Sequence, residues 1–593
     1  MLERWGRLVY RRRWILLLVS AVLLAASAVV ALQGGDLQDP ESLNASESGR
    51  ASSLLNAQLP RATSAAVPVG TTFLLVFESD DRSVDEPRYR EAVLDAVAPL
   101  RSDPRVQSMR TYYDAPAQSA SLVSRDGRRT VVSVTLRDFR AVADHYYDDL
   151  RGEIHSDTLR IYATSNLPIN HDLNRILDAD LRRAEVVALP IALVLLLLVF
   201  GTLVGALLPL GVGLLAIVAG IAGVFLLSRV MDVSPYSLNI VTLIGLGTAI
   251  DYSLFVVARF REELRHGDVE DALARTMGTA GRAIIFSGLT VAIGLSGMLF
   301  FAGTFVSSLG VAGSIVVAFA VLYAVTFLPA LLAILGRRVN ALRIPVRRSA
   351  SVGRGFWHAV ATTVMRRPLL VLLPTVAVVL LAGSPFLEFR LATADTRALP
   401  PQAESRRGYD LLVANFPGQE QSTVTVVVHW PDGDPRSADA TAYVTRVSDV
   451  YRRLPNVIRV NPPTFGGHIA VLGVVSSVPA STDEARELVR TIRGRSTTVP
   501  TMPGPPAGGE LLVTGATAFD LDTIDFVAER AVWAVAFIVV LTYLALFGLL
   551  GSVVLPLKAV LMNLLSIAAS FGALVWIFEQ GHFAEQLNFT PQS

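Results

Sequence analysis

Cysteine is absent from this chain of 593 residues, which excludes a disulfide framework, a thiolate metal site and a cysteine nucleophile. Net charge is almost absent as well, because 52 Lys and Arg balance 51 Asp and Glu, and this balance argues against nucleic acid as a partner. The 8 histidines are scattered without metal-ligand spacing, so no metal site is predicted. No Gly-x-x-x-x-Gly-Lys-Ser/Thr loop occurs, so direct ATP hydrolysis is not expected.

Charge is also scarce in total, at 17% of residues, whereas hydrophobic residues make up 52% and gather in long blocks. A helix crosses a bilayer with about 20 predominantly apolar residues. The sequence therefore predicts a polytopic α-helical membrane protein with nine spans, at 14–32, 185–205, 208–229, 238–258, 283–303, 306–335, 369–386, 530–550 and 553–578.

Arginine is distributed unevenly between the polar segments. Five arginines precede the first span, five lie in 259–282, and the connector 336–367 has eight arginines and no acid. Because cytoplasmic loops carry an excess of Lys and Arg, the N-terminus and both connectors are predicted to be cytoplasmic. We therefore expect a multi-pass protein of the plasma (inner) membrane.

Two large polar blocks, 33–183 and 387–527, are then placed outside the cytoplasm. Their patterning predicts β-α-β-β-α-β twice, the order of a ferredoxin-like α+β domain. The predicted elements are 72–78, 87–100, 106–113, 129–137, 141–154 and 159–164 in the first block, and 423–429, 438–453, 457–461, 467–477, 482–493 and 510–515 in the second.

The chain repeats itself across these blocks. Phe200-Gly201 and Leu208-Pro209-Leu210 recur as Phe547-Gly548 and Leu555-Pro556-Leu557. Transporters are often built from such repeats. The predicted organisation is 1–32 (cytoplasmic N-terminus and first span), 33–183 (first porter-like domain), 184–335 (spans two to six), 336–367 (basic cytoplasmic linker), 368–386 (seventh span), 387–527 (second porter-like domain) and 528–593 (spans eight and nine).

The fourth span, within 238–259, carries one carboxylic acid, Asp251, near its middle. Counting back from Arg259 at ~1.5 Å per residue places this acid about 12 Å inside the hydrocarbon. An ionised carboxylate there is costly unless it faces protein, a partner or water. We therefore predict that Asp251 takes up and releases protons; the alternative is a neutral acid hydrogen-bonded between helices.

Three hydroxyl residues are candidate neighbours of this acid. Tyr252 follows about 100° round the helix and can offer its hydroxyl to another span. Ser287 and Thr290 share one face of the fifth span and are possible relay neighbours, although hydroxyls in helices often bond back to their own backbone. No residue is assigned to substrate binding.

Two separated motifs carry a family resemblance. Gly245-Leu-Gly-Thr-Ala-Ile-Asp-Tyr-Ser-Leu-Phe255, followed by Arg259-Phe-Arg-Glu-Glu263, resembles the fourth-span signature of the MmpL (mycobacterial membrane protein large) branch of the RND transporter superfamily. Pro556-Leu-Lys-Ala-Val-Leu-Met-Asn563 is similar to that family's pattern at the start of its ninth span. The order of spans and polar blocks agrees over essentially the whole chain, including the RND-type internal repeat.

The resemblance implies an exporter, not an enzyme, that uses the proton gradient instead of a cofactor to move lipids or lipid-like molecules to the cell envelope. Membrane lipids or glycolipids are then the substrates and accessory envelope proteins possible partners. In the family, Asp-Tyr pairs on the fourth and tenth spans form the proton relay; Asp251 and Tyr252 match the fourth-span pair. The tenth-span pair has no position before Ser593, where three further spans are expected.

Two other interpretations stay open. The chain as given is an incomplete or inactive form, or a subunit that needs a partner with the further spans. More remotely, glycines before a membrane-embedded Asp suggest an intramembrane aspartyl protease, but that chemistry needs two carboxylates in one site. Only Asp251 is a convincing acid at mid-membrane depth.

Overall fold

The computed structural model divides the chain into two compact units. Unit 1 comprises Met1–Ser42, Asp180–Phe389 and Val527–Val575, and unit 2 comprises Leu43–Ala179, Arg390–Phe526 and Trp576–Ser593. The structure describes residues 2–37, 46–59, 71–116, 120–138, 140–343, 356–389, 396, 399–416, 422–480, 482–494, 503–587, 589 and 591. Part of the predicted basic linker, 344–355, lies outside the described residues.

Nine helices of the described residues are long and apolar enough to cross a membrane, and they correspond to the nine predicted spans. The protein is thus helical and multi-pass. The helices of these spans are α2 (Arg13–Gln33), α6 (Asn166–Phe200), α7 (Leu203–Leu227), α8 (Tyr236–Glu263), α9 (Val269–Thr276) continued by a π-helical turn and α10 (Arg282–Ser296), α11 (Phe305–Val325) with α12 (Phe327–Leu335), α14 (Pro368–Gly383), α18 (Ala516–Leu550) and α19 (Val554–Leu574). Three shorter helices, α1 (Leu2–Arg11), α13 (Phe356–Arg366) and α20 (Ala584–Leu587), precede or follow these spans along the chain.

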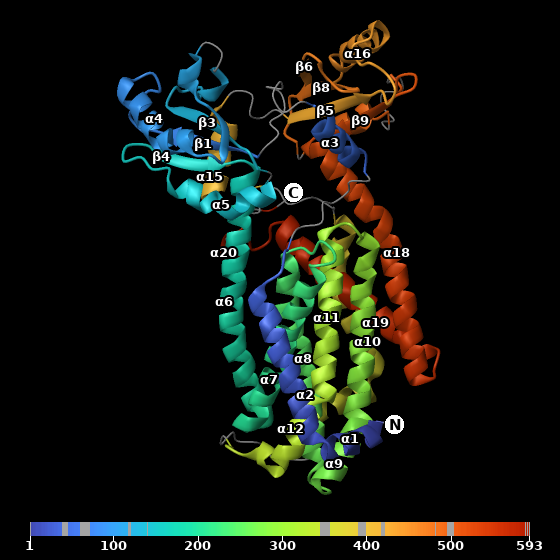
Figure 1. The fold of residues 1–593 in the computed structure, drawn as a ribbon. Helices are drawn as coiled ribbons and strands as arrows, with labels where there is room; N and C mark the ends of the chain where they lie inside the picture. The colour runs from blue at the N-terminus through green and yellow to red at the C-terminus, as the bar shows by residue number, and fades with distance from the viewer. Residues whose placement is uncertain are drawn as a thin grey trace. The chain divides into compact units, whose positions relative to one another are not determined.

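Helix α8 packs against α7 and α11 in unit 1 (Figure 1). Small residues permit this close approach: a Cβ added at Gly245 would lie 2.5 Å from Val316 Cγ2 on α11, and one at Gly220 on α7 would lie 2.7 Å from Val241 Cγ1. Contacts of this kind replace the hydrophobic effect as the source of helix association in lipid. They fix which face of α8 turns into the bundle and which turns out.

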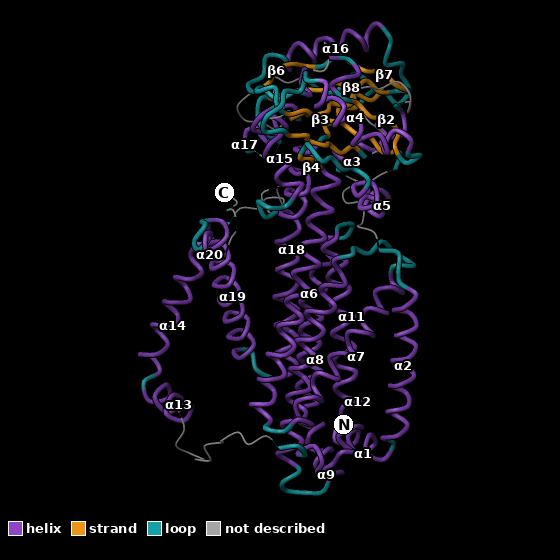
Figure 2. Tube along the Cα trace, turned by 90° about the vertical axis from the view of Figure 1, so that its left-hand side faces the viewer, coloured by secondary structure: helices purple, strands orange, loops and turns teal. Residues whose placement is uncertain are grey.

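Unit 2 contains all the strands of the described residues (Figure 2). Its first lobe is a sheet with strand order β2-β3-β1-β4, every neighbouring pair antiparallel. Helices α4 and α5 pack their apolar sides against this sheet and form one hydrophobic core with it. The bounds are β1 (Thr72–Glu78), α4 (Pro87–Ser102), β2 (Val106–Arg110), β3 (Arg129–Leu136), α5 (Arg140–Gly152) and β4 (Arg160–Thr164).

The second lobe repeats this arrangement with strand order β6-β8-β5-β9, and the added strand β7 pairs with β8. Helices α16 and α17 share its core. The bounds are β5 (Ser422–His429), α16 (Ala438–Tyr451), β6 (Val457–Val460), β7 (Thr464–Gly466), β8 (Ile469–Ser476), α17 (Asp483–Ile492) and β9 (Glu510–Thr514). The predicted β-α-β-β-α-β order of elements is therefore present twice, to within a few residues at each boundary.

Each lobe also holds a helix from the other half of the sequence. Helix α3 (Glu47–Gln58) buries Ala51 and Leu55 against Val427 and Ile469 of the second sheet. Leu412 of helix α15 (Glu404–Asn415) and Phe416, the residue after it, are buried against Val76 and Val131 of the first sheet. Figure 1 shows this exchange as the blue α3 within the orange lobe and the orange α15 within the blue lobe.

Candidate functional site

The candidate site lies on α8, which is helical because its sequence is apolar and free of proline after the N-cap residue Pro235. Leu243, Gly247, Asp251 and Phe255 follow one another at four-residue intervals and share one face. All four are exposed in unit 1; the side chains of Leu243 and Phe255 are 50% and 51% exposed. We call these four residues the α8 stripe.

Asp251 is the only charged residue of the α8 stripe. Among the residues that the structure describes, it has no hydrogen bond and no ion pair, and no second carboxylic acid bonds to it. In a bilayer, this position exposes a carboxyl group to the hydrocarbon unless further protein or water covers it. Asp251 is thus the one polar side chain of an otherwise apolar stripe.

Tyr252 lies about 100° round the helix from Asp251, and its side chain points into the bundle. Its side chain is buried at 7% exposure, and its hydroxyl has no hydrogen-bond partner of good geometry among the described residues. The hydroxyl lies against α10, 3.8 Å from the place where a Cβ at Gly288 would stand, and the hydroxyl of Ser287 is close enough to interact with it. The structure thus brings Tyr252 and Ser287 together.

Thr290 does not join this group. Its Oγ1 donates to the carbonyl oxygen of Phe286 at 2.9 Å, one turn earlier on its own helix. This is the common behaviour of a threonine inside a membrane helix. Of the two predicted relay neighbours on α10, Ser287 has its hydroxyl near that of Tyr252, whereas the hydroxyl of Thr290 bonds to its own helix.

An ion cluster at the end of α8 was not foreseen from the sequence. Glu263 is buried, and its two carboxylate oxygens lie 2.6 Å from Arg259 Nη2 and 3.2 Å from Arg275 Nε. The cluster joins α8 to α9. A signal was present, because Glu263 follows Arg259 at the four-residue spacing of a helical ion pair, but the contribution of Arg275 depends on the tertiary fold.

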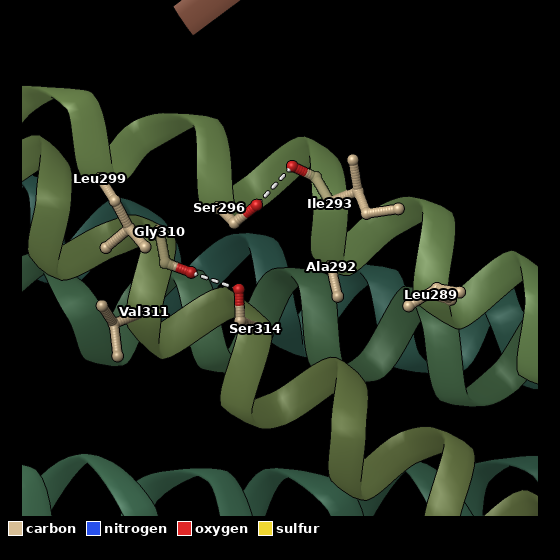
Figure 3. Close-up of a pocket in the computed structure, with 8 residues that line it drawn as sticks. All are labelled: Leu289, Ala292, Ile293, Ser296, Leu299, Gly310, Val311 and Ser314. Carbon is tan, nitrogen blue, oxygen red and sulfur yellow. Dashed lines mark hydrogen bonds between the residues drawn. The ribbon is translucent and has the colours of Figure 1, made fainter. Parts of the chain in front are cut away.

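A groove runs between α10 and α11 (Figure 3). It has a volume of about 390 Å³ and is lined by Leu289, Ala292, Ile293, Ser296, Leu299, Gly310, Val311 and Ser314. Its two hydroxyls are already engaged: Ser296 donates to Ile293 and Ser314 to Gly310, each at 2.8 Å. The groove therefore presents an apolar surface without a free polar group to orient a ligand.

No group of three or more His, Cys, Asp or Glu residues that could hold a metal ion occurs within the described part of the chain. The α8 stripe offers the single carboxyl group of Asp251, which can be charged or neutral, and the next residue, Tyr252, has its hydroxyl near that of Ser287. Such a set can bind, hold and pass on a proton.

These features define a multi-pass helical membrane protein with an isolated acid on a central helix. The model of the MMPL family matches residues 43–371 and 397–592, and the chain belongs to that family. The predicted resemblance is thereby confirmed.

Curated relatives are named as exporters or as membrane proteins. A putative membrane protein of Streptomyces coelicolor is 37% identical over 87% of this chain and 70% of its own length. The trehalose monomycolate exporter MmpL3 of Mycobacterium tuberculosis is 30% identical over 99% of this chain and 65% of its own length. The mycolic acid-containing lipids exporter MmpL11 of Mycolicibacterium smegmatis is 32% identical over 74% of this chain and 46% of its own length. The chain thus spans about two thirds of the length of the first two relatives and about half of the third.

Proposed function

We propose that this chain works in proton-driven export of lipids or lipid-like molecules from the plasma membrane to the cell envelope, with Asp251 and Tyr252 as half of a proton relay. Family membership and the names of the exporters MmpL3 and MmpL11 support the transport of lipids. The single observation that carries the proton coupling is the isolated Asp251 on the α8 stripe. A carboxyl group at this depth is tolerable when it is neutral, and it becomes charged only when water or a partner reaches it.

In this proposal Tyr252 and Ser287 supply hydroxyls that accept and donate the proton next to Asp251. A buried hydroxyl without a hydrogen bond costs about 1–3 kcal/mol, so the Tyr252 hydroxyl, which has Ser287 close by but not in good hydrogen-bond geometry, is poorly stabilised. In this proposal, the Tyr252 hydroxyl gains a well-oriented hydrogen-bond partner when the helices rearrange or when water enters. Alternating access of Asp251 to the two sides of the membrane then couples proton entry to the shape of the protein.

We also propose that both lobes of unit 2 are ferredoxin-like domains outside the cytoplasm. The strand orders β2-β3-β1-β4 and β6-β8-β5-β9 with antiparallel neighbours support the fold, and the arginine-rich connectors support the orientation. Because the chain has no cysteine, single cysteines at exposed positions such as Asp149 test the orientation. A membrane-impermeant maleimide added to intact cells is expected to label Asp149→Cys and to spare Asp268→Cys in the connector after α8.

The export proposal is tested with the full chain in liposomes that contain fluorescent trehalose monomycolate and a pH-sensitive dye. An imposed proton gradient is expected to drive both lipid movement and proton flux, and Asp251→Asn is expected to abolish both. Asp232→Asn is the matched control, because Asp232 is an exposed acid between α7 and α8. Undiminished proton flux in Asp251→Asn would remove Asp251 from the mechanism.

A second candidate function is that of a subunit whose relay is completed by further membrane helices that cover the α8 stripe. The exposure of Asp251 beside Leu243 and Phe255 favours this candidate. It predicts that the chain alone inserts and folds but carries no protons in the same liposomes. Proton flux by the wild-type chain alone would exclude it.

An intramembrane protease is not favoured, because within the described residues no second carboxyl group bonds to Asp251. Cleavage of a membrane substrate that is lost in Asp251→Asn would be needed to restore that interpretation.

A further inference from the structure

We call α3 and α15 the exchanged helices, because each packs on the sheet of the other half of the chain. The start of each exchanged helix is held by a similar set of hydrogen bonds and ion pairs, which we call the lock. In the first lobe, the carboxylate of Glu404 at the start of α15 accepts hydrogen bonds from Arg151 Nε and from the backbone N–H of Ala163, both at 2.8 Å. The next backbone N–H, that of Ser405, donates to Asp172 Oδ2 at 3.0 Å. Arg151 lies in the last turn of α5, Ala163 in β4 and Asp172 in the second turn of α6, so three elements of the first lobe meet at the start of α15.

The second lobe repeats this lock around α3. The carboxylate of Glu47 lies 3.2 Å from Arg493 Nε and accepts the backbone N–H of Val513 at 3.0 Å. The backbone N–H of Ser48 donates to Asp522 Oδ2 at 2.9 Å. The sequence pair Glu-Ser thus occurs at the start of both exchanged helices and plays the same part in each lock.

Next to each lock, the two helices that supply it are joined by a charged contact, which we call the clasp. Seven residues before the arginine of the second lock, Arg486 on α17 binds Asp520 on α18, with Nε–Oδ2 at 3.0 Å. Both side chains are largely buried. Arginine stays charged throughout the physiological pH range, so this clasp is permanent.

The clasp of the first lobe is built from other groups. Seven residues before Arg151 stands Asp144, and its Oδ1 lies 2.9 Å from Nδ1 of His171 on α6. The other ring nitrogen, Nε2, lies 3.0 Å from Oδ1 of Asp148. Tyr147 packs against the imidazole with ring centroids 5.0 Å apart. An imidazole can donate to both aspartates only when both of its nitrogens carry protons.

We propose that His171, Asp144 and Asp148 form a proton-dependent clasp that fastens α5 to α6 while the imidazole is charged, and so controls how firmly the first lobe holds α15. The link to α15 is direct, because α5 also carries Arg151, the partner of Glu404. When the imidazole loses a proton, one aspartate loses its donor and α5 retains fewer contacts with α6. The clasp stands independently of the proposed lipid export.

The charges around His171 favour its protonated form. Hydrogen bonding to Asp144 raises the pKa of His171, burial opposes this, and Asp148 adds to the rise. Burial also raises the pKa of Tyr147, which therefore stays neutral. The other charged groups nearby are Asp172 and Arg175 on α6 and the Arg151–Glu404 pair where α5 meets α15.

The direction of the pH effect follows from the raised pKa. A raised pKa in the folded state means that the clasp stabilises fully below the ordinary histidine pKa of about 6.5 and is lost as pH rises through the folded value. Acidification is thus expected to tighten the first lobe around α15. The second lobe, with Arg486, is expected not to respond in this range.

The test is hydrogen–deuterium exchange of the full chain in lipid nanodiscs at about pH 6 and about pH 8.5, corrected for the intrinsic exchange rate at each pH. In the wild type, amides of α5 and α15 are expected to exchange several-fold faster at the higher pH, whereas amides of α17 keep their protection. In His171→Gln, α5 and α15 are expected to exchange fast at both pH values. His155→Gln, which removes an exposed histidine of the same lobe, is expected to behave as the wild type.

An equal pH response of α5 and α17 in the wild type, or a pH response retained in His171→Gln, would overturn the proposal. If His171→Gln also deprotects α17, the variant has lost its fold and Asp148→Asn decides, since Asp148 is 72% exposed and its change is mild. Asp148→Asn is expected to shift the pH response of α5 to lower pH. An unshifted response would contradict the clasp.

Discussion

The two lobes of unit 2 keep the same lock and differ in the clasp beside it. Glu404 and Glu47 hold equivalent positions at the starts of α15 and α3. Each forms an ion pair with an arginine and accepts a hydrogen bond from a strand N–H. Beside them, the first lobe pairs His171 with two aspartates and the second pairs Arg486 with Asp520. The comparison teaches that holding the exchanged helix is the shared requirement, whereas the proposed response to protons between about pH 6 and about pH 8.5 belongs to the first lobe only.

The largest expected effect is on stability, and it comes from the difference in burial between the two locks. Arg493 is 2% exposed and makes two hydrogen bonds to Asp522, so Asp522→Ala removes the acid that forms both bonds and leaves the buried guanidinium with Glu47 alone as its acidic partner among the described residues. Such a loss costs about 3–5 kcal/mol. Asp172 pairs with the exposed Arg175, so Asp172→Ala is expected to cost only about 1–2 kcal/mol. Opening free energies of α3 and α15 from amide exchange measure both, and equal values would contradict the difference.

Acid is expected to act on the two lobes in opposite directions. Burial raises the pKa of Asp522, but hydrogen bonds from Arg493 and Ser48 outweigh burial and lower it. A lowered pKa gives stability above the ordinary aspartate pKa of about 3.9, and this stability is lost as pH falls through the folded value. Protection of α3 is therefore expected to fall below about pH 4, whereas acidification from about pH 8.5 to about pH 6 strengthens the clasp at His171. Amide exchange of α3 at decreasing pH checks this, and constant protection would refute it.

A smaller effect is expected from the permanent clasp. Arg486→Gln removes its ion pair with Asp520 and is expected to destabilise α17 against α18 by about 1–2 kcal/mol. Because arginine does not titrate, the loss is expected to be the same at about pH 6 and about pH 8.5. Exchange of the α17 amides is the measurement, and a loss confined to one pH would break the contrast with His171.

The smallest effect concerns how closely the exchanged helices approach their sheets. Ala51 on α3 is fully buried, and Ala51→Gly is expected to cost about 1 kcal/mol through lost packing and helix propensity. At the equivalent position α15 has Gly408, where a Cβ would lie 3.1 Å from Thr164 Cβ. In Gly408→Ala the gain in propensity is expected to be offset by this tight contact, so stability changes by less than about 0.5 kcal/mol. Thermal unfolding of both variants compares them.

The sequence was sufficient for the spans and for the strands of both lobes, because each depends on a local pattern. The apolar runs are long, and the strands alternate or form short buried runs between turns. The predicted strand 72–78 coincides with β1, for example, and the predicted 457–461 with β6 to within one residue. These elements are determined by their own residues.

The exchanged helices were not predicted, because their stability depends on a partner in the other half of the chain. Helix α3 has few apolar residues of its own. Ala51, Leu55 and Leu59 become part of a hydrophobic core because they pack on the second sheet. The repeated Glu-Ser pair was the available signal. The orientation of Ser287 toward Tyr252 and the bond of Thr290 to Phe286 likewise depend on how α8 and α10 pack, which residue spacing on one helix does not determine.

The proton-carrying role of Asp251 is tested most directly by infrared difference spectroscopy of the full chain in nanodiscs as external pH is changed. We predict a protonated carboxylic acid band that titrates with pH in the wild type and in Asp232→Asn and is missing in Asp251→Asn. Identical spectra from the wild type and Asp251→Asn would show that this carboxyl group does not exchange protons, which would contradict the proposed relay.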